Sequence, residues 1–555
     1  MSKKQKIIFW LIFIPCFLIQ ILPVIRSGLN YNYGIGFWGS NGHDAIWHLS
    51  LINHLENPFK IELSILSGET LKNYHPFYDI LISSFVSVTH LSSTLWYFQI
   101  FPIISTIILL VSSFFLGRHF TSKFSGGILL MFLNSFANSF GWLVTLFRSH
   151  TISGESLFWS MQSASNQLNP PFVLSLIFIN LLLLLILNQK INSILKSFLI
   201  LLILVLTPIT KAYGGVVVYS IFVFYSLFLF KKNKKPLILL LISLPLAYLI
   251  FSIYNSTSAS LFIFQPFWFT NSLIESPDRL YIPFLANMRY SLESSGLIGP
   301  RLICLYLVSI GFFYLGNFAW RLFGIFSLKS FRNILKLPLF FTIFLTALIP
   351  LFFIQKGTSW NTIQFLYYSL FLSNIFLTFF LTNLKLTKIN KFIFILIITT
   401  TLISNWETIG RYLSNPAPTT LQNSEIEALN FLKNQNDGFV LTYPYDKYKK
   451  KNMIAPIPLY AYETTAYVSA FSGKEAFLED EMNLEITGFN WRQRQSEEEK
   501  FFTTTDKFFA RGFLVNNKID YIYLVGDQFF SLSIFDLQIN EIFNNGQVRI
   551  YKVQK

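Results

Sequence analysis

The sequence predicts an all-α polytopic membrane domain of about eleven transmembrane helices, followed by a soluble α/β domain. Composition is the first observation behind this prediction: of 555 residues, 53% are hydrophobic and only 13% charged, about half the charged fraction usual in soluble domains. The second is that apolar runs of about 20 residues, long enough to cross the hydrocarbon core as helices, recur between residues 7 and 410. The third is that the sequence after them turns polar.

The apolar runs locate the predicted spans. They cover residues 7–25, 95–116, 124–147, 171–188, 196–210, 213–230, 236–254, 301–320, 338–355, 361–384 and 392–410. The first run lacks a small-x-small cleavage site, so we expect a retained helix rather than a signal peptide. A further stretch, 77–92, is short and rich in Ser and Thr, and we expect it to lie in the membrane interface. If it crossed the membrane, Arg118 and Lys123 would lie on the non-cytoplasmic side, against the rule that Lys and Arg concentrate in cytoplasmic loops.

Charged residues are distributed asymmetrically between the two predicted sides. With the N-terminus in the cytoplasm, the inner segments carry only cations, as the positive-inside rule expects. These cations are Lys3, Lys4, Lys6, Arg118, Lys123, Lys190, Lys196, Lys231, Lys232, Lys234, Lys235, Arg321, Lys329, Arg332, Lys336, Lys385, Lys388 and Lys391. The acids before residue 411 all fall outside: Asp44, Glu56, Glu62, Glu69, Asp79, Glu155, Glu275, Asp278, Glu293 and Glu407. Either the outward orientation of the acids has no functional significance, or the protein is a multi-pass plasma-membrane protein whose functional site lies on the outer side.

The same asymmetry excludes other classes of protein. Membrane orientation explains the net charge of +15, and no nucleic-acid-binding motif is present, so we expect no nucleic-acid partner. The two cysteines, Cys16 and Cys304, lie in apolar runs, which argues against a disulfide framework.

The segments between and after the spans set the domain boundaries. Residues 1–410 form the predicted membrane domain, with long outer loops at about 26–94, 148–170 and 255–300. Residues 411–423 contain Asn-Pro-Ala-Pro and are interpreted as a linker. Residues 424–555 are predicted to form the extracytoplasmic α/β domain. We expect strands at 439–443, 519–525 and 548–553, and helices starting near 424 and over 496–516.

The first outer loop holds the densest polar chemistry. His43, Asp44 and His48 lie in a segment whose apolar spacing predicts a helix from Asp44 onward, capped by Ser40 or Asn41. Asp44 is either a helix-start acid favoured by the dipole or a catalytic carboxylate that takes a proton from an acceptor hydroxyl. Histidines could tune it or bind phosphate.

A divalent metal, Mg or Mn, is a second possibility in this loop. Asp44 and His48 are residue types that ligate metals, but their spacing matches no specific metal motif. We therefore leave metal binding open and predict no certain cofactor.

Other polar residues at the predicted outer face are candidate substrate-binding groups. Tyr74, His75 and Asp79 end the first loop, either as an interfacial anchor or as a second acid with an aromatic wall for sugar. Lys211 either snorkels or pairs with a lipid phosphate. The remaining candidates are cations, an aromatic and amides: Arg279, Arg289, Lys356, Trp360, Asn361 and Gln364.

This architecture resembles the GT-C superfamily of membrane glycosyltransferases, in particular the protein-mannosyltransferase-like, family-39-like arrangement. The resemblance rests on one span, a long outer loop opening with an acid at Asp44, about ten further spans and an external C-terminal domain. It implies transfer of a sugar from a polyprenyl-phosphate donor on the non-cytoplasmic side, with the loop acid as base or metal ligand. Many members carry paired acids, whereas this chain has His43-Asp44.

Together these observations predict an inverting hexosyl or pentosyl transferase with Asp44 as general base and a glycan, lipid or protein as acceptor. Lys211, Lys356 or an arginine of the 255–300 loop would stabilise the departing phosphate. The alternatives are a transporter or flippase, or a non-catalytic protein of envelope polysaccharide assembly. Transporters favour ionisable groups at the midplane and internal repeats, and the sequence has neither.

Overall fold

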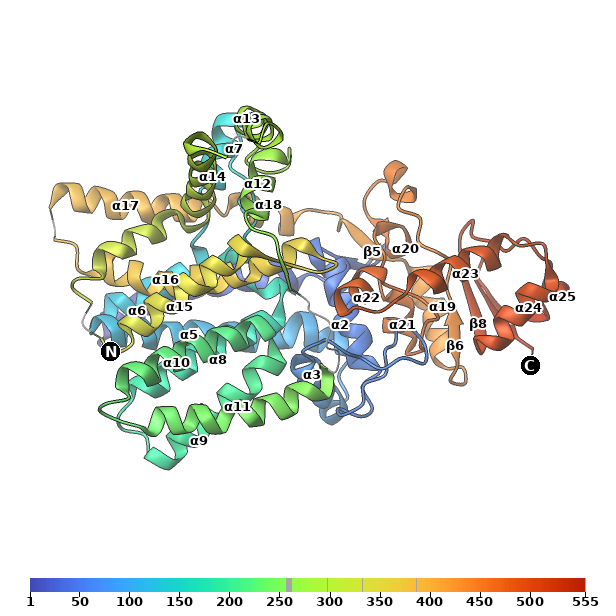
Figure 1. The fold of residues 1–555 in the computed structure, drawn as a ribbon. Helices are drawn as coiled ribbons and strands as arrows, with labels where there is room; N and C mark the ends of the chain where they lie inside the picture. Colours follow the sequence, from blue (N-terminus) through green and yellow to red (C-terminus); the bar gives the residue numbers. More distant parts are fainter. Residues whose placement is uncertain (256–261, 297, 332, 386, 555) are drawn as a thin grey trace. The chain divides into compact units, whose positions relative to one another are not determined.

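The chain folds into two compact units, each built from separated stretches of sequence (Figure 1). The computed structural model describes residues 1–255, 262–296, 298–331, 333–385 and 387–554, so Arg332 and parts of the predicted 255–300 loop lie outside the described residues. The membrane unit comprises Met1–Pro23, Pro102–Ser252 and Ser258–Leu413. The composite unit comprises Val24–Phe101, Ile253–Thr257 and Ser414–Lys555, and so combines the predicted first loop with the C-terminal region.

Among the described residues, nine helical segments are long and apolar enough to cross a membrane. They are Lys3–Ile25 (α1), Ser93–Thr121 (α4 Ser93–Leu95, η2 Trp96–Ile100 and α5 Phe101–Thr121), Pro170–Leu187 (α8), Ser193–Thr210 (α9), Ala212–Leu229 (α10), Lys235–Tyr254 (α11), Pro300–Ser327 (α14 Pro300–Phe318 and η4), Ser359–Thr382 (η5 Ser359–Ile363 and α16 Gln364–Thr382) and Lys388–Leu413 (α17 Lys388–Ile403 and α18 Trp406–Leu413). The predicted span 124–147 consists of α6, Phe124–Phe136, and α7, Gly141–Ser149, bent by 50°. The predicted span 338–355 is the 17-residue α15, Lys336–Phe352. The polytopic all-α membrane prediction is confirmed.

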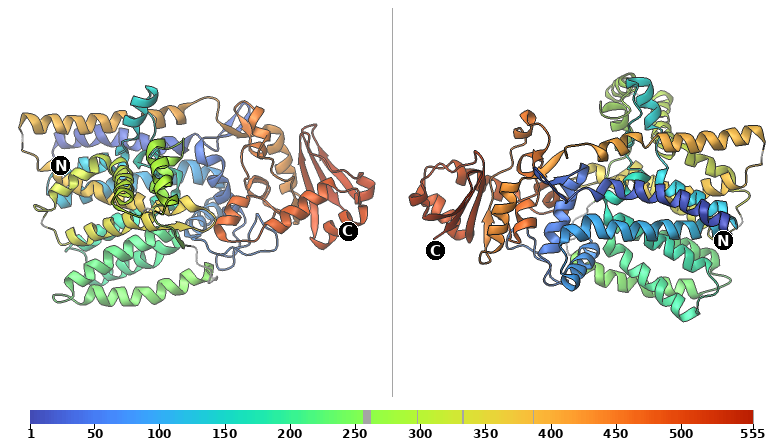
Figure 2. Two further views of the ribbon diagram at one scale, coloured as in Figure 1. Left: turned by 45° about the horizontal axis from the view of Figure 1, so that its top comes forward. Right: turned by 180° about the vertical axis from the view of Figure 1, so that it is seen from behind.

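Apolar clusters among the described residues hold the membrane unit together, and Figure 2 shows its helices from two further directions. One cluster joins α5, α8, α9, α10, α15 and α16 through side chains such as Phe172, Val217 and Phe371. A second joins α1, α5, α6, α16 and α17, and a third forms around Phe269 and Phe313. Helices α5 and α6 approach so closely that a Cβ on Gly117 would lie 2.4 Å from the carbonyl oxygen of Gly126. Small residues at such crossings are how helices pack where lipid supplies no hydrophobic driving force.

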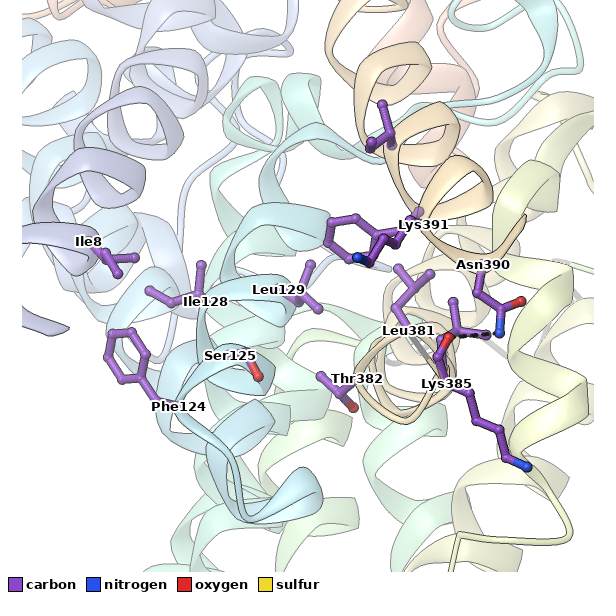
Figure 3. A pocket seen from close by; sticks show the side chains of 13 residues that line it. Ile8, Phe124, Ser125, Ile128, Leu129, Leu381, Thr382, Lys385, Asn390 and Lys391 are labelled. Atoms are coloured by element: carbon purple, nitrogen blue, oxygen red, sulfur yellow. Dashed lines mark hydrogen bonds between the residues drawn. The ribbon is translucent and has the colours of Figure 1, made fainter. Parts of the chain in front are cut away.

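An apolar groove of about 580 Å³ opens on the membrane unit. Its lining comes from α1, α6, α16, α17 and the turn before α17, and Figure 3 shows it from close by. Three of its polar lining residues, Lys385, Asn390 and Lys391, lie at the start of α17 or in the turn before it. A hydrocarbon chain suits such a lining.

Arg321 does not lie among the exposed inner cations, where the sequence placed it. It is 3% exposed in η4, Ala319–Ser327. Its Nε donates to Asn374 Oδ1 at 3.0 Å, and its Nη1 donates to Gln162 Oε1 at 3.1 Å. A buried guanidinium needs acceptors of this kind, because leaving its donors unpaired in a low dielectric costs several kcal/mol. This hydrogen-bond network could not be predicted from the distribution of charged residues among the loops.

Shorter elements complete the membrane unit. They are η3 Ser163–Leu168, α12 Trp268–Glu275, α13 Pro283–Ser294, and the paired strands β3 Phe262–Phe264 and β4 Phe353–Gln355.

The composite unit contains two four-stranded sheets. In the first, the order is β1 Asn30–Tyr31, β2 Gly34–Phe37, β5 Thr419–Leu421 and β7 Ile457–Pro458. Antiparallel pairing of Ile35 with Leu421 joins the first loop to the C-terminal region within one sheet. Gly34 is required there, because its φ is +120° and a Cβ would lie 2.0 Å from the carbonyl oxygen of Leu421.

The second sheet confirms the predicted C-terminal strands. Its order is β6 Phe439–Leu441, β8 Ile519–Val525, β10 Val548–Val553 and β9 Ile539–Asn544. The surrounding helices are α19 Asn423–Lys433, η6 Lys449–Asn452, α20 Leu459–Tyr462, α21 Tyr467–Ser472, α22 Glu481–Thr487, α23 Arg492–Thr503, α24 Lys507–Asn516 and α25 Ile534–Leu537. The helix expected over 496–516 is thus two helices, and Asp506 caps the second through Phe508 N and Phe509 N.

Candidate functional site

The composite unit places three of the predicted catalytic side chains on or beside one short helix. This helix, α2, runs from Asp44 to Asn53 and follows the 3-10 turn η1, Gly39–Gly42. The expected cap by Ser40 or Asn41 is wrong: His43 occupies the N-cap position without a side-chain cap bond, and Asn41 Nδ2 donates to Ser27 Oγ at 3.0 Å. Asp44 sits in the first turn, where the helix dipole favours an anion.

His43 lies between two carboxylates. Its Nδ1 is 2.9 Å from Asp44 Oδ1, and its Nε2 is 3.3 Å from Asp480 Oδ1. The His43 and Asp480 side chains are 5% and 0% exposed, whereas the Asp44 side chain is 59% exposed. Burial opposes protonation of His43, but the charges of Asp480 and Asp44 outweigh it and hold the pKa of His43 well above its ordinary 6.5. A buried imidazolium therefore joins an accessible carboxylate to a buried one.

Asp480 is a residue that the sequence did not single out. It is held in place as the N-cap of α22, where Asn483 N donates to its Oδ1 at 3.2 Å and Asn483 Nδ2 to its Oδ2 at 2.8 Å. The run Glu479-Asp480-Glu481 was the only signal that could have pointed to it.

His48 forms a second imidazole–carboxylate pair. Its Nδ1 lies 2.7 Å from Oδ1 of Asp79, in the first turn of α3, Phe77–Thr89. His48 is 8% exposed and Asp79 fully buried. The Tyr74 hydroxyl lies 3.5 Å from His48 Nδ1, and the Tyr74 ring meets Trp47 edge to face at 5.6 Å between centroids. The structure thus brings His48, Asp79 and Tyr74 together.

His75 stacks on Tyr74 at 4.7 Å between ring centroids. His75 thus adds a third ring to the aromatic side chains of Trp47 and Tyr74 beside His48.

Three of the other candidates come together inside the membrane unit. Lys211 is 5% exposed, and its Nζ lies 5.8 Å from the Tyr213 ring. The Tyr213 hydroxyl donates to Gln355 Oε1 at 2.6 Å, and Asn361 Nδ2 donates to the same oxygen at 2.9 Å. Gln364 Nε2 donates in turn to Asn361 Oδ1. These side chains form one cation-and-amide cluster.

The remaining candidates, also in the membrane unit, take no part in these hydrogen bonds. Lys356 and Trp360 are exposed. Arg279 lies over the Trp159 ring, 3.8 Å from its centroid, and Arg289 forms ion pairs with Glu275 and Glu293. Arg289 is thus held by acids of its own segment.

Glu155 is a further carboxylate, for which the sequence predicted only a position on the outer side of the membrane. Thr408 Oγ1 donates to its Oε2 at 2.7 Å, Ser165 Oγ donates to the same oxygen at 3.0 Å, and Gln162 N donates to Oε1 at 3.1 Å. Because Gln162 also accepts from Arg321, Glu155 belongs to the interior polar network of the membrane unit.

The resemblance to GT-C enzymes allows a metal site. Within 1–255, 262–296, 298–331, 333–385 and 387–554, no group of three or more His, Cys, Asp or Glu side chains has the geometry to hold a metal ion. His48 directs Nδ1 at Asp79, and His43 uses both nitrogens on carboxylates.

Solved structures are similar to this chain over nearly its whole length. One is the archaeal oligosaccharyltransferase AglB from Archaeoglobus fulgidus, in complex with an inhibitory peptide and a dolichol-phosphate: the TM-score is 0.53 at 12% identity, covering 94% of this chain and 70% of that one. An Archaeoglobus fulgidus oligosaccharyltransferase in complex with Zn and sulfate gives 0.52 at 13% identity, covering 93% of this chain and 68% of that one. Arabinofuranosyltransferase AftD from Mycobacteria gives 0.50 at 10% identity, covering all of this chain and 40% of that one.

The protein has the GT-C fold. Both neighbouring enzymes are membrane glycosyltransferases of the GT-C superfamily, so the architecture that the sequence resembled is confirmed. No protein-family model and no curated protein matches the chain. The chain spans less than half the length of AftD.

Proposed function

We propose that this protein is a membrane glycosyltransferase that moves a sugar from a polyprenyl-phosphate donor to an extracytoplasmic acceptor. The observation that carries the proposal is the accessible carboxylate of Asp44, held beside the buried imidazolium of His43 in a chain with the GT-C fold. The neighbour that carries a dolichol-phosphate supports a lipid-linked donor.

In this reaction Asp44 is the general base. An acceptor hydroxyl gives its proton to the carboxylate while its oxygen bonds to the anomeric carbon of the donor sugar. The bond from that carbon to the phosphate oxygen breaks, and polyprenyl phosphate leaves. Attack opposite the leaving group inverts the anomeric configuration. The exposure of Asp44 lets an acceptor reach it, and His43 fixes the orientation of the carboxylate through the 2.9 Å contact.

The departing phosphate needs positive charge. We propose Lys211 for this role, with Asn361 and Gln364 as amide donors to phosphate or sugar, because these residues share one buried cluster. Exposed Lys356 and Trp360, and Arg279 on its tryptophan, are proposed as secondary contacts to the donor. Tyr74, His75 and the pair formed by His48 and Asp79 are proposed to line the sugar side of Asp44.

The test is transfer of radiolabelled sugar from a panel of polyprenyl-phosphate sugars by the purified protein. Wild type is compared with Asp44→Asn and with Glu56→Gln, a control that neutralises an exposed acid of the same loop. We expect transfer by wild type and the control, and a loss of at least a hundredfold in Asp44→Asn, the range of general-base catalysis. Undiminished transfer by Asp44→Asn, in protein with the wild-type melting curve, would refute the assignment of the base.

A further inference from the structure

A small acidic pocket lies within the C-terminal part of the composite unit, and one of its acids, Asp480, is the partner of His43. Its residues come from the segment after β6, from α20 and the segment after it, from α21, from α22 and the segment before it, from α23 and from the segment after β8. Five of them carry carboxyl groups: Glu463, Glu479, Asp480, Glu481 and Glu498. No Lys, Arg or His side chain is among the described residues that line it. Lys449, whose Nζ is 5.0 Å from the Tyr460 ring, is ion-paired to Asp527. The potential in the pocket is therefore negative whenever these carboxyl groups are ionised.

Three of these acids have structural partners. Glu479 accepts from Val468 N and Ser469 N, both at 3.0 Å, at the start of α21. Asp480 caps α22, and Glu481 accepts from the Thr464 hydroxyl.

Glu498 and Thr465 are different, and they point to a missing ligand. Glu498 is 1% exposed and Thr465 5% exposed, and both line the pocket. Within the described part of the chain, Glu498 Oε1 and Thr465 Oγ1 have no hydrogen-bond partner. A buried carboxylate without a partner costs free energy, and a ligand with N–H donors and positive charge would remove that cost.

Burial makes these acids hard to ionise in the empty pocket. It raises the pKa of Glu479 to about 8 and that of Glu481 to about 7, and it raises the pKa of Glu498 well above its ordinary value. The acids also repel one another: Glu481 and Glu479 add to the shift of Glu498. A cation bound among them would favour the charged forms.

The lining selects the kind of cation. The residues described here form no metal-binding group, so the geometry does not fit a hard metal ion. Four tyrosines line the pocket, Tyr443, Tyr445, Tyr460 and Tyr467, and aromatic rings beside carboxylates are typical of sites for organic ammonium ions. The cavity volume is about 40 Å³, a few times the roughly 10–15 Å³ that one water needs on the same measure, so the pocket has room for an ammonium group but not for a whole sugar ring.

We propose that this pocket binds the primary ammonium group of an amino sugar. Glu498 Oε1 and Thr465 Oγ1 accept its N–H donors, and the tyrosine side chains with Gln528 face the hydroxyl-bearing ring. Aromatic side chains and polar donors together suit a sugar better than an alkyl chain. The proposal does not depend on the transferase assignment, because it concerns binding and not transfer.

Calorimetric titration of the full-length protein in detergent at pH 7 tests it. The probes are glucosamine and N-acetylglucosamine, which differ at the amine by an acetyl group that removes its charge. We expect saturable binding of glucosamine and at least tenfold weaker binding of N-acetylglucosamine. Glu498→Gln is expected to weaken glucosamine binding at least tenfold, and Thr465→Val severalfold. Glu499→Gln, an exposed neighbour on the same helix, is the matched control and is expected to bind like wild type.

Several outcomes would overturn the proposal. They are absence of glucosamine binding to folded wild type, equal binding of the acetylated sugar, and wild-type affinity in Glu498→Gln. Ca²⁺ binding that displaces glucosamine would make this a metal site. Binding of Nα-acetyl-lysine amide without binding of glucosamine would make it a peptide site. Because the readout is binding, failure here leaves the transfer assay unaffected.

Discussion

The pair formed by His43 and Asp480 should be strongly coupled, and a double-mutant cycle measures that coupling. The single changes are His43→Gln and Asp480→Asn, combined in the double variant. The charged atoms lie 3.3 Å apart with side chains 5% and 0% exposed. Coulomb's law with an effective dielectric constant of 20 gives roughly 5 kcal/mol of attraction at that distance. Desolvation offsets part of it, so we expect a coupling free energy of about 2–3 kcal/mol near pH 6.

The coupling should depend on pH with a defined sign. The folded-state pKa of His43 is raised above its ordinary 6.5. Its stabilisation is therefore fully present below about pH 6.5 and is lost as pH rises through the raised value. Urea unfolding of the detergent-solubilised protein, followed by tryptophan fluorescence at a series of pH values, measures the coupling. The cycle cancels most of the background from the buried acids, because they are present in all four proteins.

A coupling below about 0.5 kcal/mol at pH 6 would refute this reasoning, since that is the scatter between independent sites. A coupling that does not fall toward high pH would show that His43 is not the titrating partner. Asp437→Asn serves as a control. The carboxylate of Asp437 is fully exposed where it pairs with Lys474, so its removal is expected to have little effect.

Three further predictions follow from other contacts. Asp79→Asn should lower the free energy of unfolding by roughly 2 kcal/mol and slow sugar transfer, because it weakens the 2.7 Å bond to buried His48. Glu69 is an exposed acid of the same loop, and Glu69→Gln should change neither quantity in matched melting and transfer assays. Glu425→Gln should stabilise the protein by roughly 5 kcal/mol at pH 9 but little at pH 5 in pH-dependent unfolding. Burial raises the pKa of Glu425 to about 8, so wild type loses stability as pH rises from about 4.5 to about 8; a pH-independent difference would contradict this. Transfer should persist in EDTA, and a loss restored by Mn²⁺ would instead assign Asp44 as a metal ligand.

The membrane architecture was predictable because each span is a local property. A run of about 20 apolar residues crosses a bilayer whatever its neighbours are. The bend between α6 and α7 was not predictable in this way, since the break at residues 137–140 contains no proline. Strand β8 was predicted with its observed bounds, because its buried run of Ile, Tyr, Leu and Val is strongly β-forming.

The site was predictable only where its parts are neighbours in sequence. His43 and Asp44 are adjacent, and α2 carries both Asp44 and His48. Asp480 contacts His43 from the far end of the chain, and no spacing rule connects positions so distant. The cap at Ser40 or Asn41 failed because Asn41 bonds Ser27 instead, a tertiary contact that overrides local propensity.

Synthesis of this chain separates strands that must later pair. Strand β2 leaves the ribosome early, and its partner β5 follows only after nearly all of the membrane unit has been made. At typical elongation rates the delay is roughly 20–75 s. Throughout it β2 has an open hydrogen-bonding edge, and α2 lacks the helix α21 on which it packs. The nascent loop therefore needs protection until the last quarter of the protein arrives to complete it.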